Sequence, residues 1–358
     1  MSTDKTEAAS ISVKLTEQLK ESLSVPLDKH KKWVIFSDLH MGDGGSTDDF
    51  RVNSQLFCSA LDRYYATKNF ALVLNGDVEE LQRSNLSNIV KRWPEVYQQF
   101  DAFYDRNALY KIVGNHDLEL LVRRDLPYRY PHHESLRLNY QNDSIFIFHG
   151  HQASKKYQRH NELIGFTLKY FANPLGIKSY SVSHSSKKQY KIEKRVYRFS
   201  ASQKVVSIIG HTHRPLFESL HKVERLRFKI EQLCRDYARS SEKNLLKIQE
   251  EIIAHKKELK KHHQESGEQH LRSYLYNTLY HIPCVFNSGC VVGKRGMTCL
   301  EIEGDKIRLV HWFDKNISRK YLRQSGYQPE QLDDTNFYRL VINEESLKYI
   351  FTRIKLLS

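Results

Sequence analysis

The fold class that this 358-residue sequence predicts is α/β, with a mixed sheet at its centre. Short apolar runs rich in Val, Ile and Phe recur along the chain, and each ends at polar residues or glycine, as buried strands do. Stretches with helical spacing lie between these runs and are long enough to connect parallel strands. Near the end, two further runs flank a polar turn, which indicates an antiparallel hairpin and therefore a mixed sheet.

The expected strands follow one another in a regular rhythm. They occupy residues 34–36, 71–74, 110–113, 145–148, 205–209 and 284–286. Residues 50–66 form the first expected crossover helix. The expected hairpin pairs residues 297–302 with residues 307–312 across a Glu-Gly-Asp-Lys turn.

Three segments depart from this rhythm. The start of the chain is polar and only weakly periodic, which predicts a loosely held helix or a tail. A basic, aromatic and amphipathic segment predicts a helical lid, and two apolar stripes at spacings of three and four predict an antiparallel helical hairpin. The predicted organisation is a tail (1–30), a core (31–218) that includes the basic lid (151–206), the hairpin insertion (219–275), core completion (276–315) and a C-terminal extension (316–358) with a helix near 344–355.

Composition narrows the classes of function. Apolar residues make up 40% and charged residues 27% of the chain, which is typical of a folded globular protein. No apolar run reaches membrane-spanning length, so a cytoplasmic protein is expected. The five cysteines form no CxxC pair, which argues against a disulfide framework or a thiolate zinc site. A net charge of +14 favours anionic partners, which include nucleic acid, anionic lipid and phosphorylated small molecules.

The expected strands up to residue 209 end in residues that can bind a divalent cation. They lead into Asp38-Leu39-His40, Asn75-Gly76-Asp77, Gly114-Asn115-His116-Asp117, His149-Gly150-His151 and Gly210-His211-Thr212-His213. Carboxyl ends of neighbouring strands converge on one rim of an α/β sheet, so these side chains are expected to meet. Mixed oxygen and imidazole ligands suit Mn, Fe, Zn, Co or Ni better than Ca. Because the candidates exceed the four ligands of one tetrahedral metal, we expect two divalent ions that share a bridging aspartate.

In this order, the motifs DLH, GD, GNHD, HGH and GHTH resemble those of the calcineurin-like metallophosphoesterases. The resemblance covers residues 33–215 and the strand around residues 286–289. It implies a four-layer sandwich of two mixed sheets flanked by helices, to which this sequence adds the helical hairpin.

The resemblance also implies a role for each motif residue. By position, the first metal ion would be bound by Asp38, His40 and His213, and the second by Asn115, His149 and His211. Asp77 would bridge the two ions, and His116 would act as general acid toward the leaving group. The implied reaction is hydrolysis of a phosphate ester or pyrophosphate by attack of a metal-bridged hydroxide, with Mn as the expected metal.

Residues beside these motifs receive weaker assignments. His151 is expected to lie behind the ligands or face substrate, and Asp117 is expected to orient its own loop. In the lid, Lys155, Lys156 and Arg159 are candidates to contact substrate phosphate, although a purely structural cap accounts for the lid almost equally well.

The substrate stays open at this stage. The lid and the sequence GHTHRP resemble the UDP-2,3-diacylglucosamine pyrophosphatases, lipid A enzymes at the inner membrane surface, which implies a lipid-linked substrate and peripheral contact with an anionic membrane. The chain departs from their pattern by carrying His116 in place of an arginine, by HGH in place of HGD, and by the hairpin. A general phosphoesterase is therefore the broader prediction.

Two alternatives belong to other classes. A nuclease or nucleotide phosphodiesterase would also use the positive charge, but the chain carries no recognised nucleic-acid module. A non-catalytic scaffold of the same fold is the second alternative, and the presence of all seven ligands argues against it. The sequence does not predict the oligomeric state or the metal's identity beyond the ions named above.

Overall fold

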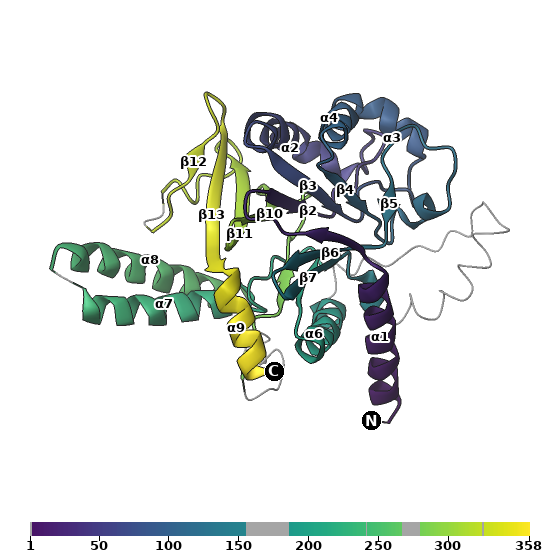
Figure 1. Cartoon of the computed structure of the whole chain (residues 1–358). Coiled ribbons are helices and arrows are strands. Elements are labelled where there is room, and N and C mark those ends of the chain that lie inside the picture. Colours follow the sequence, from purple (N-terminus) through teal and green to yellow (C-terminus); the bar gives the residue numbers. More distant parts are fainter. Residues whose placement is uncertain (1, 155–185, 241, 267–279, 324–325) are drawn as a thin grey trace.

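The computed structural model describes residues 2–154, 186–240, 242–266, 280–323 and 326–358, and two mixed sheets form its centre (Figure 1). The first sheet has the strand order β1 (Leu23–Pro26), β6 (Ser135–Tyr140), β7 (Asp143–Phe148), β8 (Val206–Ile209), β9 (Val285–Asn287). The second has the order β12 (Glu330–Gln331), β13 (Phe337–Ser346), β11 (Lys306–Asp314), β10 (Met297–Glu303), β2 (Lys32–Phe36), β3 (Phe70–Asn75), β4 (Leu109–Ile112), β5 (His132–His133).

Helices cover the outer faces of both sheets and complete four layers, which confirms the predicted fold class (Figure 1). On the side of the larger sheet lie α2 (Ser54–Ala60), α3 (Leu86–Arg92) and α4 (Pro94–Asp105). On the side of the smaller sheet lie α1 (Ser2–Glu21), α6 (Ser186–Gln203) and α9 (Leu347–Leu357). Among the helices of the described residues, none combines the length and the apolar character that crossing a bilayer requires.

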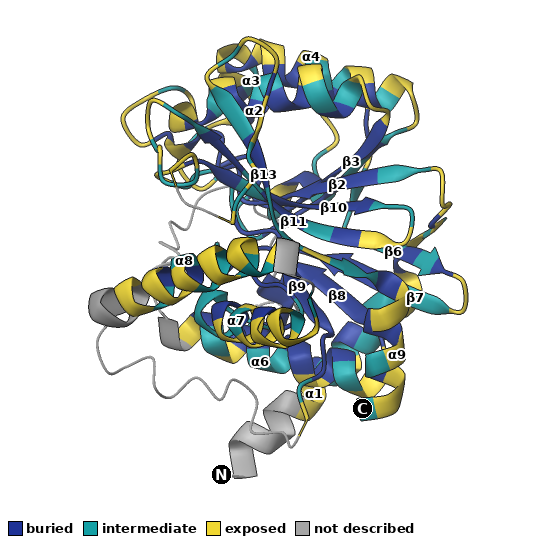
Figure 2. Cartoon of the chain, turned by 90° about the vertical axis from the view of Figure 1, so that its left-hand side faces the viewer, coloured by how far each residue is buried: buried dark blue, intermediate teal, exposed yellow. Residues whose placement is uncertain are grey.

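Strand β2 shows why its short apolar sequence specifies a central strand. Successive side chains of a strand point to opposite faces, so Trp33 and Ile35 pack between the sheets while Val34 and Phe36 pack under the outer helices. All four are fully buried, which is why the strand is apolar throughout instead of alternating (Figure 2). The same pattern holds in β3, with Val73 on the inner face and Leu74 on the outer face.

The expected hairpin near residue 300 forms as predicted. Strands β10 and β11 pair antiparallel, with Glu303 opposite Lys306 and a two-residue turn between them. Gly304 adopts φ +60° in this turn, a conformation that glycine reaches without steric cost. Strand β10 also pairs antiparallel with β2, so this hairpin joins the parallel strands β2 to β5 to the antiparallel part of the larger sheet.

Both ends of the chain are packed more fully than the sequence suggested, although the helix expected near residues 344–355 is present as α9. The first 30 residues, expected to be a loosely held helix or a tail, form α1 and the edge strand β1, which pairs parallel with β6. Ile11 and Leu15 of α1 are buried against the smaller sheet and its helices. The extension after residue 315 supplies β13, which pairs with β11 along its length, and α9, which begins at Leu347. Both ends are part of the packed core because their few apolar side chains meet partners far away in the sequence.

The predicted helical hairpin is α7 (Lys222–Arg239) and α8 (Glu242–Ser266), which lie side by side and project from the body (Figure 1). Glu258 of α8 anchors its base. This buried carboxylate accepts hydrogen bonds from Lys222 and Lys320, each at 2.6 Å, and from Tyr327 at 3.0 Å. Lys320 and Tyr327 belong to the C-terminal extension, so the extension holds the hairpin in place.

Of the predicted lid, α6 and residues 151–154 are described, whereas Lys155, Lys156 and Arg159 lie outside the described residues.

His311 lies near Lys222 and Lys320, where the helical hairpin joins the body, and it makes the free energy of unfolding depend on pH. Burial and the neighbouring Lys222 and Lys320 lower the pKa of His311 to about 4, so the folded protein keeps the ring neutral. The unfolded chain protonates the ring near pH 6.5, so stability is full above pH 6.5 and falls as the pH drops toward 4. We expect His311→Gln to reduce this acid slope by about 1.4 kcal/mol per pH unit in that window, measured by urea unfolding from pH 4 to 8. An unchanged slope would contradict the assignment, and the exposed His30 provides the matched control as His30→Gln.

Candidate metal centre

The loops after β2, β3, β4, β7 and β8 carry the predicted ligand motifs, and the structure brings these loops together. Backbone hydrogen bonds join the loops after β2 and β3, from Asp38 N to Gly76 O at 3.0 Å and from His40 N to Asp77 O at 2.9 Å. Five motif residues adopt a left-handed backbone conformation, which non-glycine residues rarely do: Asp38, His40, Asp77, His211 and His213. Such strained residues concentrate at functional sites, where surrounding contacts hold them.

One group of side chains consists of Asp38, His40 and His213, and one potential ligand atom from each lies within 4.8 Å of the others. Nε2 of His213 is 3.0 Å from Oδ1 of Asp38 and 3.2 Å from Nε2 of His40. These three residues are the ones that the motifs assigned to the first metal ion. The structure therefore places a carboxylate oxygen and two imidazole nitrogens around one point.

A second group consists of Asp77, His149 and His211, again with ligand atoms within 4.8 Å of one another. Nε2 of His149 is 3.0 Å from Oδ2 of Asp77. The same Asp77 oxygen is 3.9 Å from Nε2 of His40, so Asp77 also belongs to a group with His40 and His116. Asp77 is thus the carboxylate between the two sets of ligands, the place that a bridging residue requires.

Glu80, which none of the predicted motifs contains, connects His40 and His116. One carboxylate oxygen of Glu80 lies 3.0 Å from Nδ1 of His40, and the other lies 2.8 Å from Nδ1 of His116. A carboxylate only accepts hydrogen bonds from these rings, so both Nδ1 atoms donate and both Nε2 atoms face the centre. The position of Glu80, shortly after Asp77 in the sequence, does suggest a residue close to the ligands. Glu79 is equally close in sequence, however, so the sequence does not show which of the two acids faces the histidines.

The donor set fits a pair of divalent cations. Nε2 of His211 and Oδ1 of Asn115 are buried and have no hydrogen-bond partner among the described residues. Asn115 lies beside Asp77, since the backbone N of the next residue, His116, donates to Oδ1 of Asp77 at 2.8 Å. Buried polar atoms are normally paired, so two unpaired lone pairs at one site indicate a ligand that binds there. Carboxylate, amide and imidazole donors together suit borderline divalent metals.

Glycines in the motifs let the loops approach each other. A Cβ atom on Gly76 would lie 2.5 Å from Nδ1 of His149, and one on Gly210 would lie 2.7 Å from Oδ2 of Asp38. A Cβ atom on Gly114 would collide with the carboxylate of Asp77. Any larger residue at these positions would displace a candidate ligand. The glycines in GD, GNHD and GHTH are therefore required by packing against the centre.

The electrostatics of the centre favour cations. Burial alone would raise the pKa of Asp38, but His213 and His149 lower it to about 2. Burial alone would lower the pKa of His149, whereas Asp77 and Asp38 raise it to about 9. For His211, burial and the nearby His149 lower the pKa to about 3. Metal ligands bind in their deprotonated forms, so a divalent cation here would compete with protons for the same lone pairs.

Asp117 and His151 lie next to the centre but outside the three groups. Asp117 accepts hydrogen bonds from the backbone N of Val78 at 2.7 Å and of Gly114 at 2.5 Å, so it ties the loop after β3 to the loop after β4. His151 is buried, with its ring centroid 5.5 Å from that of His149. Asn287 of β9 is a further contributor, since its Nδ2 donates to the backbone O of Gly210 at 2.9 Å.

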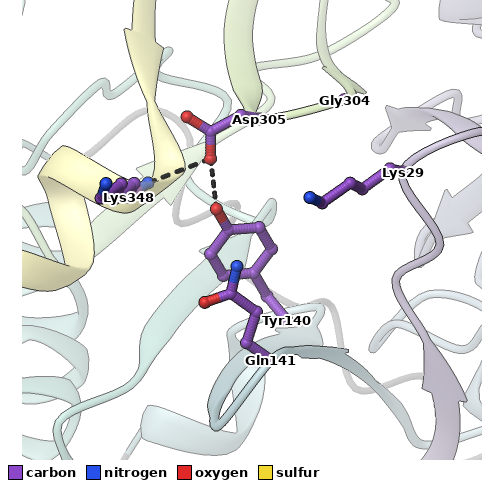
Figure 3. A pocket seen from close by; sticks show the side chains of 6 residues that line it. All are labelled: Lys29, Tyr140, Gln141, Gly304, Asp305 and Lys348. Carbon is purple, nitrogen blue, oxygen red and sulfur yellow. Dashed lines mark hydrogen bonds between the residues drawn. The ribbon is translucent and has the colours of Figure 1, made fainter.

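A hollow at the opposite end of the strands takes no part in this arrangement. Figure 3 shows this cavity of about 320 Å³, in which Lys29, Tyr140 and Lys348 surround Asp305. Lys29 precedes β2, Tyr140 is the last residue of β6, and Asp305 lies in the turn before β11. Tyr140 and the backbone N of Lys348 both donate to Asp305, so its carboxylate is already satisfied.

One comparison with known proteins identifies a family for the segment that carries the motifs. A family model described as calcineurin-like phosphoesterase matches residues 31–215, and no curated protein matches the chain at a significant level. One similar solved structure is a conserved uncharacterized protein from Streptococcus pneumoniae, described as a predicted phosphoesterase, with 12% identity, a TM-score of 0.29 and coverage of 79% of this chain and 88% of that chain. Another is a single mutant of Vps29 from Entamoeba histolytica, with 10% identity, a TM-score of 0.35 and coverage of 87% and 99%. Because the family model spans just over half of the sequence, the chain belongs to the calcineurin-like phosphoesterase family.

Proposed function

We propose that this protein hydrolyses a phosphate ester or pyrophosphate with two divalent metal ions. The observation that carries the proposal is the convergence of Asp38, His40 and His213 on one side of Asp77 and of His149 and His211 on the other. Asp38, His40 and His213 would hold one ion, Asn115, His149 and His211 the other, and Asp77 both. When bound, a metal pair supplies an acidified water as nucleophile and neutralises charge on the phosphoryl oxygens.

The chain's own residues contribute binding and proton transfer. The net charge of +14 attracts an anionic phosphorylated substrate over a long range. His116 is held by Glu80 through Nδ1, which leaves Nε2 to donate a proton to the departing oxygen. Burial opposes protonation of this ring, but Asp77 and the hydrogen bond to Glu80 raise its pKa above the ordinary value.

The proposal is tested by removing metals and restoring them one at a time. Purified protein is stripped with a chelator, then supplied with Mn²⁺, Zn²⁺, Fe²⁺, Co²⁺ or Ni²⁺ and assayed with bis-p-nitrophenyl phosphate, p-nitrophenyl phosphate and a UDP-linked lipid. We expect at least one metal to restore hydrolysis, with Mn²⁺ the first candidate. The three substrates separate diester, monoester and pyrophosphate activity. Full binding of metal without turnover of any substrate would favour a non-catalytic scaffold.

The role of His116 predicts a dependence on the leaving group. A general acid contributes about 100- to 10,000-fold when the departing oxygen needs a proton, and much less when it leaves as a stable anion. We expect His116→Asn to reduce kcat by about 100-fold or more for an alkyl phosphate ester and by far less for a p-nitrophenyl ester. Equal losses for the two ester types would show that His116 does not protonate the leaving group.

A further inference from the structure

The loop between β8 and α7 carries two of the candidate metal ligands, His211 and His213. Contacts with other segments of the chain hold this loop in place. His211 adopts φ 63° and His213 adopts φ 55°, so both candidate ligands in this loop are left-handed although neither is glycine. Each such residue costs about 1–3 kcal/mol and persists only where neighbouring contacts fix it. The residue between them, Thr212, makes those contacts.

Helix α6 supplies two of them. Nε2 of Gln189 donates to the backbone O of Thr212 at 2.9 Å, and the hydroxyl of Thr212 donates to Oε1 of Glu193 at 3.0 Å. Gln189 and Glu193 are four residues apart and therefore share one face of α6. Asn287 completes the set by donating to the Thr212 hydroxyl at 3.0 Å. Hydrogen bonds thus hold this loop to both α6 and β9.

Glu193 also reaches the hairpin. Its second carboxylate oxygen, Oε2, accepts a hydrogen bond from Nε2 of His221 at 3.0 Å. His221 is the N-cap residue that immediately precedes α7, and its backbone N donates to Glu224 in the first turn of that helix at 3.0 Å. Glu193 itself is fully buried, and a buried carboxylate that loses one partner is costly. A shift of the start of α7 must therefore break a bond to Glu193 or change its hold on Thr212.

We propose that Glu193 is a positioning residue that couples the helical hairpin to the metal centre through His221 and Thr212. The inference rests on the proposed function, because it concerns the binding of metal by His211 and His213. Such coupling is reciprocal: a correctly placed hairpin strengthens metal binding, and metal binding stabilises the first turn of α7. A displacement of α7 would therefore change the affinity of the centre for metal.

The experiment compares Mn²⁺ binding by metal-stripped full-length variants, followed by electron paramagnetic resonance of the free ion. Losing a group that orients metal ligands from outside typically weakens binding by about 10- to 100-fold, and we expect a loss of this size in Glu193→Ala and His221→Phe. Glu193→Gln should lose less affinity than Glu193→Ala, since its oxygen still accepts from Thr212. Glu224→Gln is the matched control, because it weakens the same helix end without touching the ligand loop; we expect a lower Tm and unchanged Mn²⁺ affinity.

The rate of backbone hydrogen exchange is a second measurement. If Glu193 had only a structural role, Mn²⁺ would not change this rate in α7. Mn²⁺ should slow exchange of the backbone amides in the first turn of α7 in the wild type and in Glu224→Gln, but not in Glu193→Ala. Unchanged Mn²⁺ affinity in His221→Phe would overturn the coupling to the hairpin, and unchanged affinity in Glu193→Ala would overturn the positioning role of Glu193; either result leaves the proposed function intact. If Glu193→Ala does not fold, His221→Phe decides alone. A wild-type protein that binds no Mn²⁺, Zn²⁺ or Fe²⁺ would remove the proposed function and this inference with it.

Discussion

Replacing Asp77 with alanine is expected to abolish metal-dependent hydrolysis. Asp77 lies within 4.0 Å of His40, His116 and His149, so its loss removes the shared carboxylate from both sets of ligands. Changes to groups that merely orient ligands cost about 10- to 100-fold, and we expect Asp77→Ala to exceed 100-fold in kcat/KM. The measurement is hydrolysis of bis-p-nitrophenyl phosphate together with metal content per chain, which should fall in parallel.

The control for this variant is Asp43→Asn. Asp43 is an exposed aspartate in the Gly42–Gly45 loop, where it accepts a hydrogen bond from Gly45 N at 3.1 Å, and it belongs to none of the three groups. We expect its activity to stay within about twofold of wild type, in line with the small effect of exposed substitutions. Turnover by Asp77→Ala at the wild-type rate would show that the reaction occurs elsewhere.

Replacing Arg339 with methionine is expected to destabilise the fold by about 3–5 kcal/mol, because it leaves a buried charge without its partner. Arg339 donates through Nη2 to Glu301 at 2.6 Å and through Nε at 3.0 Å, and Glu301 is fully buried. Tyr65 also donates to Glu301, at 2.8 Å, but a hydroxyl cannot replace the cation. Urea unfolding at pH 7 measures the loss.

The double variant Arg339→Met with Glu301→Gln separates lost charge pairing from lost packing. The glutamine still accepts from Tyr65 and carries no charge, so we expect most of the lost stability to return, since replacing both members of a buried ion pair is often nearly neutral. If the double variant is as unstable as the single one, packing of the Arg339 side chain, and not its ion pair with Glu301, stabilises β13 in the sheet. Either outcome shows how this strand of the C-terminal extension is held in the core.

The strands and the candidate ligands were predictable because their signals are local. A strand buried on both faces, such as residues 33–36, must be apolar throughout, and the polar motif that follows it marks the carboxyl end of the strand. The helical hairpin was predictable for a similar reason, since its apolar spacing is a property of each helix alone. The order of the motifs along the chain then indicated the resemblance to the calcineurin-like metallophosphoesterases.

The supporting residues were not predictable in the same way. Glu193 belongs to no motif, and Thr212 stands in GHTH only as the residue between the two histidines; Glu193 becomes important only because α6 brings it against Thr212 and His221. Nor did the weak periodicity of the N-terminal segment show that Ile11 and Leu15 would be buried, since two side chains bury too little surface to mark a core helix. Each of these roles depends on a partner that is distant in the sequence.

By itself, the sequence determined which side chains could bind metal and that they follow buried strands, because ligand chemistry and strand burial are written in neighbouring residues. Only the tertiary structure decided how they are arranged: Asp77 between the two sets of ligands, Glu80 across His40 and His116, and Glu193 between the ligand loop and the hairpin. The physical reason is that a hydrogen bond or a shared ligand forms within about 3 Å. Packing of distant segments, and not proximity along the chain, sets that distance.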